Sequence, residues 1–561
     1  MTAVRPSPRL ARFPVTALGA AIAASLTLSA CSSLEVDPYT EEEVRQRAIS
    51  DQAKMYSAQE PITQPITFYE AAARALKYNL DYRLKLMESA LSSDLRDVSR
   101  HELLPQLVAS AGYSDRSNDS GGTSIGIEDR QESLRPSTSE ERYHTTAGLD
   151  LSWSLLDFGL AYYENQQKSD QILMAEERRR KVAQNVLRDV RNAYWRALAA
   201  QRLIPQLNVL LARTEVALNA SREAQRQGLL PRQELLSYQR ALLDSTSLLT
   251  ARRQDLELAQ SELAALMSLP PGTRLELADM PEPELPPEIS DVARLEQIAL
   301  EQRPEIMEEW YRQRVNQLDL EAAKLRLWPN ITVSAGLAYD SNDYLYNNDW
   351  AQSGVNVSLN LLRLLQYPDL NQAQDTQSDV DELRRTALSM AVLTQVRVGA
   401  LRYHLALEEL KYADESLEVD EDLLDYSKAA ASTSIGSELE VIRAQSRYLL
   451  SQYSREAAYS RAQAAWGRLF NSVGVDVLPD TVADHSVQTL AAELENAMNI
   501  HETQGIIAAH PSGTTDHTYG TPLQRATPQT PSPRTTSDSA TPATATPMSQ
   551  PGAIQGGGNA Q

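Results

Sequence analysis

The segments LLPQLVASAG at residues 103–112 and LWPNITVSAG at residues 327–336 align with each other without a gap. Both have proline in the third position, and both end in Ser-Ala-Gly. A second pair follows, because GLDLSWSLL at 148–156 resembles GVNVSLNLL at 354–362. Two motifs that recur in the same order indicate a tandem repeat of one structural unit.

Four short segments next to these motifs alternate between apolar residues at odd positions and small or polar residues at even positions. They are 107–113, 149–155, 331–339 and 355–361. Such alternation predicts strands with one apolar and one polar face. It is typical of transmembrane barrel strands, and also of a soluble sandwich with one dry face. The candidates for aromatic residues at a membrane interface are Trp153, Trp328, Tyr339 and Trp350.

Each strand pair has a polar loop, at 115–143 or 341–352. Four strands are too few for a membrane barrel, since the smallest ones use about eight. Open strand edges in lipid would leave backbone groups without hydrogen bonds, which is prohibitive. If these strands span a membrane, several chains must therefore share one barrel.

Long helical patterns make up most of both repeats. A helical stretch precedes each strand pair (67–103 and 291–327), and a longer region follows it (160–269 and 366–471). In the first long region, apolar or small residues recur mostly at alternating steps of three and four, which predicts a coiled coil. This seam comprises Val182, Val186, Val190, Ala193, Ala197, Ala200, Ile204, Leu207, Leu211, Thr214 and Leu218.

Each long region contains a helix-breaking glycine, Gly228 or Gly436, near its middle. Glycine commonly ends a helix, so each region is expected to be a helical hairpin. The tip of each hairpin then lies far from the strands.

The only cysteine, Cys31, ends the segment Leu28-Ser29-Ala30-Cys31 behind an uncharged apolar stretch and three N-terminal arginines. This pattern matches a bacterial lipoprotein signal, in which the cysteine becomes the acylated first residue. The alternative is an ordinary secretory signal with a chance cysteine. Ser32 follows the cysteine in place of the aspartate of inner-membrane retention, which favours the outer membrane.

The repeat and the signal together predict the domain organisation. The linker between the repeats is rich in proline, and the end of the chain is rich in Pro, Thr and Ser, a composition typical of disorder. The expected segments are a signal peptide (1–30), an N-terminal acylated segment (31–65), the first repeat (66–269), a linker (270–290), the second repeat (291–471) and a mostly disordered C-terminal segment (472–561).

The net charge is −22, from 53 basic and 75 acidic residues. Removal of the signal takes three arginines and no acid, so the mature chain has a charge of about −25. This balance argues against a nucleic-acid partner. The seven histidines are scattered without metal-ligand spacing. The sequence thus predicts no metal, no cofactor and no enzymatic activity.

Residues 66–471 resemble the TolC-like outer membrane efflux proteins, the outer membrane factor family. The motifs that carry the resemblance are the tandem repeat, ALEQRPEI (299–306), WSLLDFG (153–159), and a tip glycine ahead of ELLSYQRAL (234–242) and of ELEVIRAQSRYL (438–449).

The resemblance implies a mainly α fold with membrane β: four barrel strands and long coiled-coil helices per chain. Three chains would form a homotrimer with a twelve-stranded β-barrel and an α-helical periplasmic tunnel. The tips near Gly228 and Gly436 would meet a periplasmic adaptor (membrane fusion) protein, joined to an inner-membrane pump.

The implied protein is a passive channel in the outer membrane of a Gram-negative bacterium. It would span that membrane and be anchored in its lipid through Cys31. Small-molecule efflux is favoured, with type I protein secretion as an alternative. A structural coiled-coil lipoprotein is a further alternative, although a spacer would not need strand pairs.

Acidic side chains that narrow the tunnel are also implied, and Glu440 and Glu234 match their positions best. Arg443 stands where some members carry a second acid, and it lies about one helical turn after Glu440, which allows pairing on a helix. The alternative for either glutamate is an ordinary solvated helix face.

Overall fold

The computed structural model describes residues 38–56, 59–132, 135–227, 231–279, 282–432, 438–477, 484 and 486–509. The chain divides into two units, Met1–Thr514 and Thr515–Gln561, and every described residue belongs to the first. Cys31, Gly228 and Gly436 lie outside the described residues.

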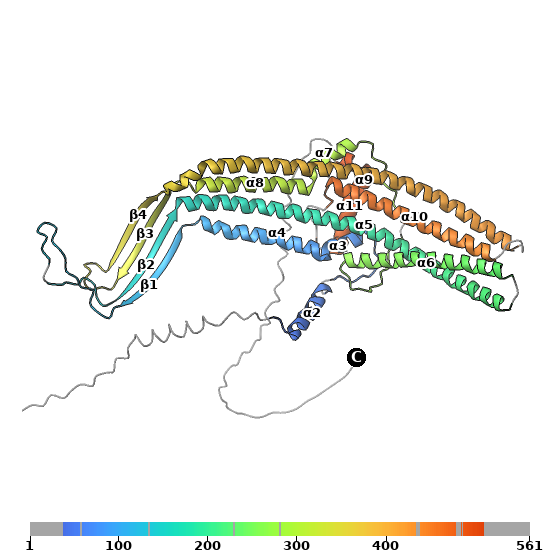
Figure 1. The fold of residues 1–561 in the computed structure, drawn as a ribbon, viewed down its shortest axis with the longest axis horizontal. Coiled ribbons are helices and arrows are strands. Elements are labelled where there is room, and N and C mark those ends of the chain that lie inside the picture. Colours follow the sequence, from blue (N-terminus) through green and yellow to red (C-terminus); the bar gives the residue numbers. More distant parts are fainter. Residues whose placement is uncertain are drawn as a thin grey trace, which may run out of the picture. The chain divides into compact units, whose positions relative to one another are not determined.

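The elements of the first unit are labelled in Figure 1. In chain order they are α2 (Glu41–Tyr56), α3 (Phe68–Tyr78), α4 (Leu80–Ser99), η1 (Arg100–Leu103), β1 (Gln106–Asp115), β2 (Tyr143–Ser154), α5 (Leu155–Gln227), α6 (Arg232–Leu266), α7 (Val292–Gln302), α8 (Pro304–Leu325), β3 (Asn330–Asp340), β4 (Asp349–Ser358), η2 (Leu361–Gln366), α9 (Tyr367–Ser432), α10 (Glu438–Val473), α11 (Val487–Gln504) and α12 (Ile506–Ala509).

The expected repeat is present, because two short helices, two strands and two long helices occur twice in the same order. The helix starts are also alike. The side chain of Thr67 caps α3 and that of Asp291 caps α7, each accepting a hydrogen bond from a backbone N–H in the first turn. The first two helices are separated by the cap residue Asn79 in one copy and by Arg303 in the other, where Pro304 then opens α8.

The four strands form one antiparallel sheet in the order β1-β2-β3-β4. Alternation located all four, but β2 and β4 begin well before the expected segments 149–155 and 355–361, and β4 ends at Ser358 because Leu361 already begins the 3-10 helix η2. Residues 143–148 of β2 and 349–354 of β4 continue the strand pairing, although the hydrophobic alternation does not extend to them. The outer strands, β1 and β4, are the two edges of the sheet.

The pairing register assigns each residue to a face of the sheet. Leu107 pairs with Leu151, and Leu151 pairs with Ala335, so one face is mainly apolar. Trp350 pairs with Ala338 on the other, polar face, and its indole N–H donates to Gln352 Oε1 (3.4 Å). Trp350 therefore does not share the apolar face that Trp153 and Tyr339 occupy, and its place at a membrane interface stays a prediction.

The long helices form two hairpins, α5–α6 and α9–α10. With 73 residues, α5 is roughly 110 Å long at 1.5 Å per residue. The predicted seam is confirmed: from Val186 to Leu218 its side chains are buried or half-buried. Opposite it, α6 buries a leucine at every seventh position, namely Leu235, Leu242, Leu249, Leu256 and Leu263.

A helix lies within the C-terminal segment that was expected to be mostly disordered. Val487, Leu494 and Met498 of α11 belong to the same buried cluster as Phe68 of α3 and Trp195 of α5. Residues 487–504 are thus a helical part of that segment, and because residues 510–561 lie outside the described part, the expectation that the segment is mostly disordered stays a prediction. Among the described residues, no helix combines the length and the hydropathy needed to cross a membrane.

Candidate functional site: subunit edges, helix tips and linker

One edge of the molecule carries an uncovered apolar stripe on α4. Its six side chains are spaced by three or four residues, so they share one helix face. Each is between 46% and 63% exposed: Leu80, Leu84, Met87, Leu91, Leu95 and Val98. We call this set the α4 stripe. Contiguous exposed apolar surface of this kind marks an interaction site.

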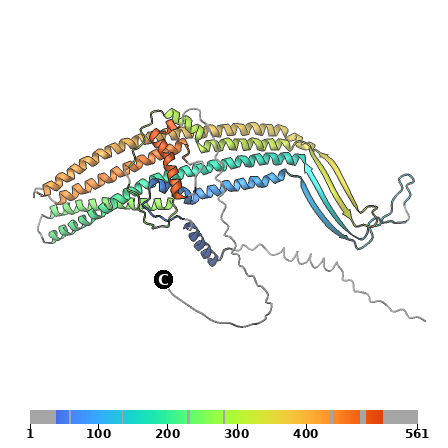
Figure 2. The same cartoon turned by 180° about the vertical axis from the view of Figure 1, so that it is seen from behind.

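The opposite edge carries a second stripe, on α9. Its ten large apolar side chains are between 40% and 75% exposed: Val380, Leu383, Met390, Val398, Leu401, Leu405, Tyr412, Val419, Leu423 and Tyr426. We call this set the α9 stripe. Helix α4 leads into the edge strand β1, and the other edge strand, β4, leads into α9. Figures 1 and 2 show α5 and α8 between these two edges.

The two repeats are joined along α5 and α8 by ion pairs. Arg314 Nε lies 2.9 Å and 2.8 Å from the two carboxylate oxygens of Asp170, whose side chain is buried. Farther along, Arg178 Nη2 lies 2.9 Å from Glu308 Oε1. The wall formed by α4, α5, α8 and α9 is therefore continuous across the repeat boundary.

The predicted constriction residues lie at equivalent places in the two hairpins. Glu234 is the third residue of α6, Glu440 is the third residue of α10, and both are exposed. Arg443 is exposed one turn later. A carboxylate in the first turn of a helix is also stabilised by the helix dipole. The positions of the two glutamates are therefore consistent with a tunnel constriction and also with an ordinary solvated helix face.

The tips of the two hairpins are brought together by packing. Ile442 of α10 and Leu242 of α6 belong to one small buried cluster with Leu218 of α5. Arg213 of α5 also donates to Gln445 Oε1 of α10 (2.9 Å). Glu234 and Glu440 are thus carried by helices, α6 and α10, that pack against each other.

The linker between the repeats crosses the helices as an extended strap. It pairs with the start of the first repeat through Ile66, which bridges to Leu277. It then contacts three helices in turn: Gln201 of α5 binds the backbone of Leu277, Tyr459 of α10 donates to Pro283 O (3.0 Å), and Tyr403 of α9 donates to Pro286 O.

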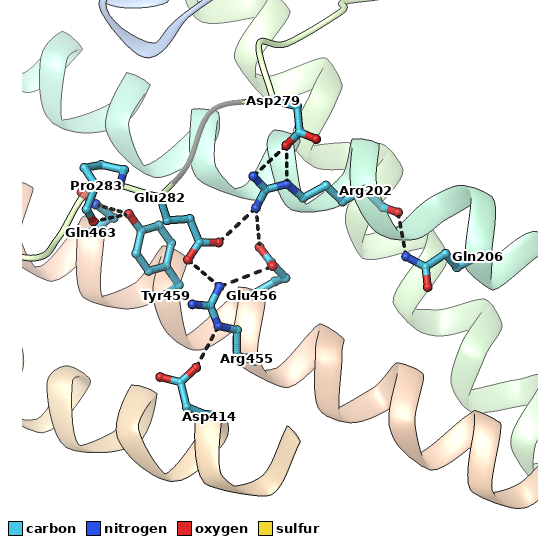
Figure 3. Close-up of polar contacts among 10 residues, drawn as sticks. All are labelled: Arg202, Gln206, Asp279, Glu282, Pro283, Asp414, Arg455, Glu456, Tyr459 and Gln463. Carbon is cyan, nitrogen blue, oxygen red and sulfur yellow. Dashed lines mark hydrogen bonds and ion pairs between the residues drawn. The ribbon is translucent and has the colours of Figure 1, made fainter. Parts of the chain in front are cut away.

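Charged groups fasten the middle of this strap. Figure 3 shows Glu282 between two arginines: Arg202 Nη1 lies 3.0 Å from Glu282 Oε1, and Arg455 Nη1 lies 2.5 Å from Glu282 Oε2. Arg202 also binds Asp279 (2.8 Å), and Arg455 binds Asp414 of α9 (2.9 Å). One network therefore holds the linker, α5, α9 and α10 at a single level.

A second carboxylate in the network is partly desolvated. Glu456 lies 3.5 Å from Arg455 and 3.7 Å from Arg202. Burial, and then the neighbouring carboxylate of Glu282, raise the pKa of Glu456 above its ordinary value. Within the described part of the chain, no three His, Cys, Asp or Glu side chains are grouped closely enough to hold a metal ion.

Known structures share this fold. CmeC, an outer membrane channel of Campylobacter jejuni, has a TM-score of 0.57 at 13% identity, with 74% of this chain and 90% of that chain covered. The open-state MtrE outer membrane channel of Neisseria gonorrhoeae has a TM-score of 0.55 at 14% identity, with 72% and 88% covered. CusC, known for transmembrane channel formation, has a TM-score of 0.53 at 17% identity, with 75% and 96% covered. The fold is thus that of outer-membrane channel proteins.

The sequence supports the same class. Residues 71–268 match the outer membrane efflux protein family. No curated protein matches the chain. The resemblance to the TolC-like outer membrane factors is therefore confirmed, in fold along most of the chain and in sequence over residues 71–268.

Proposed function

We propose that three copies of this chain close into one outer-membrane channel of a tripartite export system. The observation that carries the proposal is the pair of unlike edges. Each copy has two edge strands, each with one unpaired side in the sheet, and each edge strand is connected to a helix with an uncovered apolar stripe. Pairing β1 with β4 of the next copy satisfies the open backbone groups. The same step brings the α4 stripe beside the α9 helix of that copy.

Three sheets of four strands give a twelve-stranded barrel, with the apolar face toward lipid and the polar face toward the lumen. The long helices continue from the strands as the wall of a tunnel in the periplasm. Because one edge meets the other edge of the next copy, the contact is heterologous, and it closes into a ring of three when each copy is rotated by one third of a turn. Conduction through such a ring is passive.

Partners and cargo follow from the family. The hairpin tips near Gly228 and Gly436 are proposed to contact a periplasmic adaptor protein, and through it an inner-membrane pump. Glu440, Glu234 and Arg443 are proposed to line the constriction. Small-molecule efflux is favoured over type I protein secretion, and a neighbouring gene for a proton-driven pump or an ATP-driven exporter would separate the two.

The first experiment is the native mass of the mature protein extracted from outer membranes in mild detergent. A mass of three chains supports the shared barrel. A stable single chain contradicts it, because four strands cannot close, and favours the structural lipoprotein.

A cysteine pair tests the edge contact itself. Leu84 precedes the start of β1 at Gln106 by as many residues as Val380 follows the end of β4 at Ser358, so the two positions lie at matching distances from the sheet along their helices. Both are exposed, so a chain with Leu84→Cys and Val380→Cys is expected to form disulfide-linked dimers and trimers on oxidation. Either single variant is the control. Equal monomer bands in all three chains would contradict this edge pairing.

The lipid anchor has its own test. We propose that Cys31 is acylated, so Cys31→Ala is expected to abolish palmitate labelling. Labelling that survives the substitution contradicts the lipoprotein assignment without affecting the channel.

A further inference from the structure

One row of the sheet places a carboxylate in the middle of the polar face. The register aligns Val108 of β1 with Asp150 of β2, Gly336 of β3 and Gln352 of β4. The row lies well inside the ladder, with paired residues on both sides of it. A side chain here faces the lumen of the proposed barrel, not its rim.

The other charges of this face lie toward the loops. The paired strands carry neither lysine nor arginine on the polar face. Asp340 is the last residue of β3, where its carboxylate accepts from the backbone N–H of Asn342 (3.0 Å). His144 is the second residue of β2, at the same end. Asp150 is therefore the charged residue farthest inside the described strands.

Glycines make the space that Asp150 occupies. A Cβ at Gly336 would lie 2.5 Å from Asp150 Oδ1, which is too close for two heavy atoms. A Cβ at Gly148 would lie 3.4 Å from the other carboxylate oxygen, Oδ2. The carboxylate thus lies along the sheet, over the glycine of the second Ser-Ala-Gly motif. Glycine at position 336 therefore leaves room for the carboxylate of Asp150, a role that the repeated motif alone does not explain.

We propose that Asp150 is a charge-selecting residue of the channel lumen. This inference rests on the proposed trimer, in which three copies of Asp150 form one acidic ring within the barrel. Such a ring enriches cations and repels anions, as rings of acidic side chains do in other pores. It acts separately from the constriction proposed near Glu440, at the opposite end of the long helices.

Salt controls how far such a ring acts. The screening length is about 10 Å at 0.1 M salt and about 3 Å at 1 M. Because the side chain of Asp150 is solvent-exposed, dissolved ions screen its charge, and its electrostatic field extends far into the lumen only at low salt. Cation preference from Asp150 is therefore expected at about 0.1 M and is expected to disappear at about 1 M.

The test is the reversal potential of the full-length trimer in planar bilayers under a KCl gradient, with wild type and Asp150→Asn. The substitution keeps the shape of the side chain and removes its charge. The cation-to-anion permeability ratio is expected to fall by about twofold near 0.1 M and to be unchanged at about 1 M. Asp349→Asn is the matched control, because Asp349 pairs with Tyr339 on the apolar face.

The outcomes are distinct. A conducting Asp150→Asn trimer with an unchanged ratio at low salt overturns the role of Asp150 and leaves the channel intact. An equal fall in Asp349→Asn overturns it as well, because the effect would then not depend on the face. If wild type forms neither a trimer nor a conducting pore, the proposed function fails, and this inference fails with it.

Discussion

Buried Arg191 of α5 and half-buried Glu502 of α11 form an ion pair between groups that are far apart in the sequence. The same guanidinium donates to Gln463 of α10 (2.8 Å) and lies 4.7 Å from the ring centre of Phe68 in α3. One side chain therefore joins helices from both repeats to α11.

Glu502→Gln is expected to lower the free energy of unfolding by about 3 kcal/mol, because it leaves the buried Arg191 charge without its counter-charge. Thermal unfolding of the detergent-extracted protein measures this. Glu495→Gln is the control, since Glu495 is exposed on the same helix. Equal melting temperatures for the two variants would contradict a stabilising pair.

Glu177 predicts a pH dependence of stability. Burial, opposed by Arg180, raises the pKa of Glu177 to about 7, and Glu176 and Asp476 add like charge. The folded state then binds more protons than the unfolded state between about pH 4.5 and 7, so stability falls as the pH rises through this range. The free energy of unfolding, measured across these pH values, should depend less on pH in Glu177→Gln than in the wild type. An equal pH dependence of the free energy of unfolding in both proteins would contradict the raised pKa of Glu177.

The α6 leucines predict a contrast between neighbouring positions. Leu249 is fully buried, and Leu248 is 41% exposed. Leu249→Ala is expected to cost about 2–5 kcal/mol, because it opens a cavity against α5, and Leu248→Ala is expected to cost far less. Limited proteolysis of the α5–α6 hairpin and thermal melts measure the difference. Similar behaviour of the two variants would contradict the seven-residue seam.

The strap predicts a local effect of Glu282. In Glu282→Gln, Arg202 and Arg455 lose the counter-charge that they share. Amide hydrogen exchange over residues 275–289 is expected to quicken by about tenfold, which corresponds to about 1.4 kcal/mol. Glu284→Gln is the control, because Glu284 is an exposed residue of the same strap. Exchange that is equal in both variants would show that the network does not fasten the linker.

The tip predicts a change of selectivity. Glu440→Gln is expected to weaken cation preference in bilayer recordings, because three copies would form a ring near the constriction. Glu234→Gln tests the equivalent position of the first repeat in the same way. Selectivity that is unchanged in Glu440→Gln removes Glu440 from the gate.

Much of the fold could be predicted because its signals are local. Alternation at 331–339 and the three-four spacing from Val190 identify a strand and a coiled coil without tertiary information. The same reasoning missed the early start of β2, where Tyr143 to Gly148 continue the strand pairing without hydrophobic alternation. It also missed α11, whose few buried residues share a cluster with residues of α3, α5 and α10 that are far away in the sequence.

The candidate site was less predictable. The α4 stripe has a helical spacing, but spacing alone does not tell a core face from a subunit edge. Asp150 appeared only as a polar position of a strand, because its glycine neighbour, Gly336, belongs to the other repeat. The strap network joins Arg202 to Glu456 across much of the chain, and no short motif encodes such a contact.

The two edges of the chain differ, so damage to one of them leaves the other able to bind. A subunit with a polar substitution in the α4 stripe would still offer an intact α9 edge to a normal copy. In cells that make both forms, such a subunit would enter mixed rings of the proposed trimer and leave a gap in each. The mutant form is thus expected to be dominant over the normal one, and its effect is expected to exceed its share of the expressed protein.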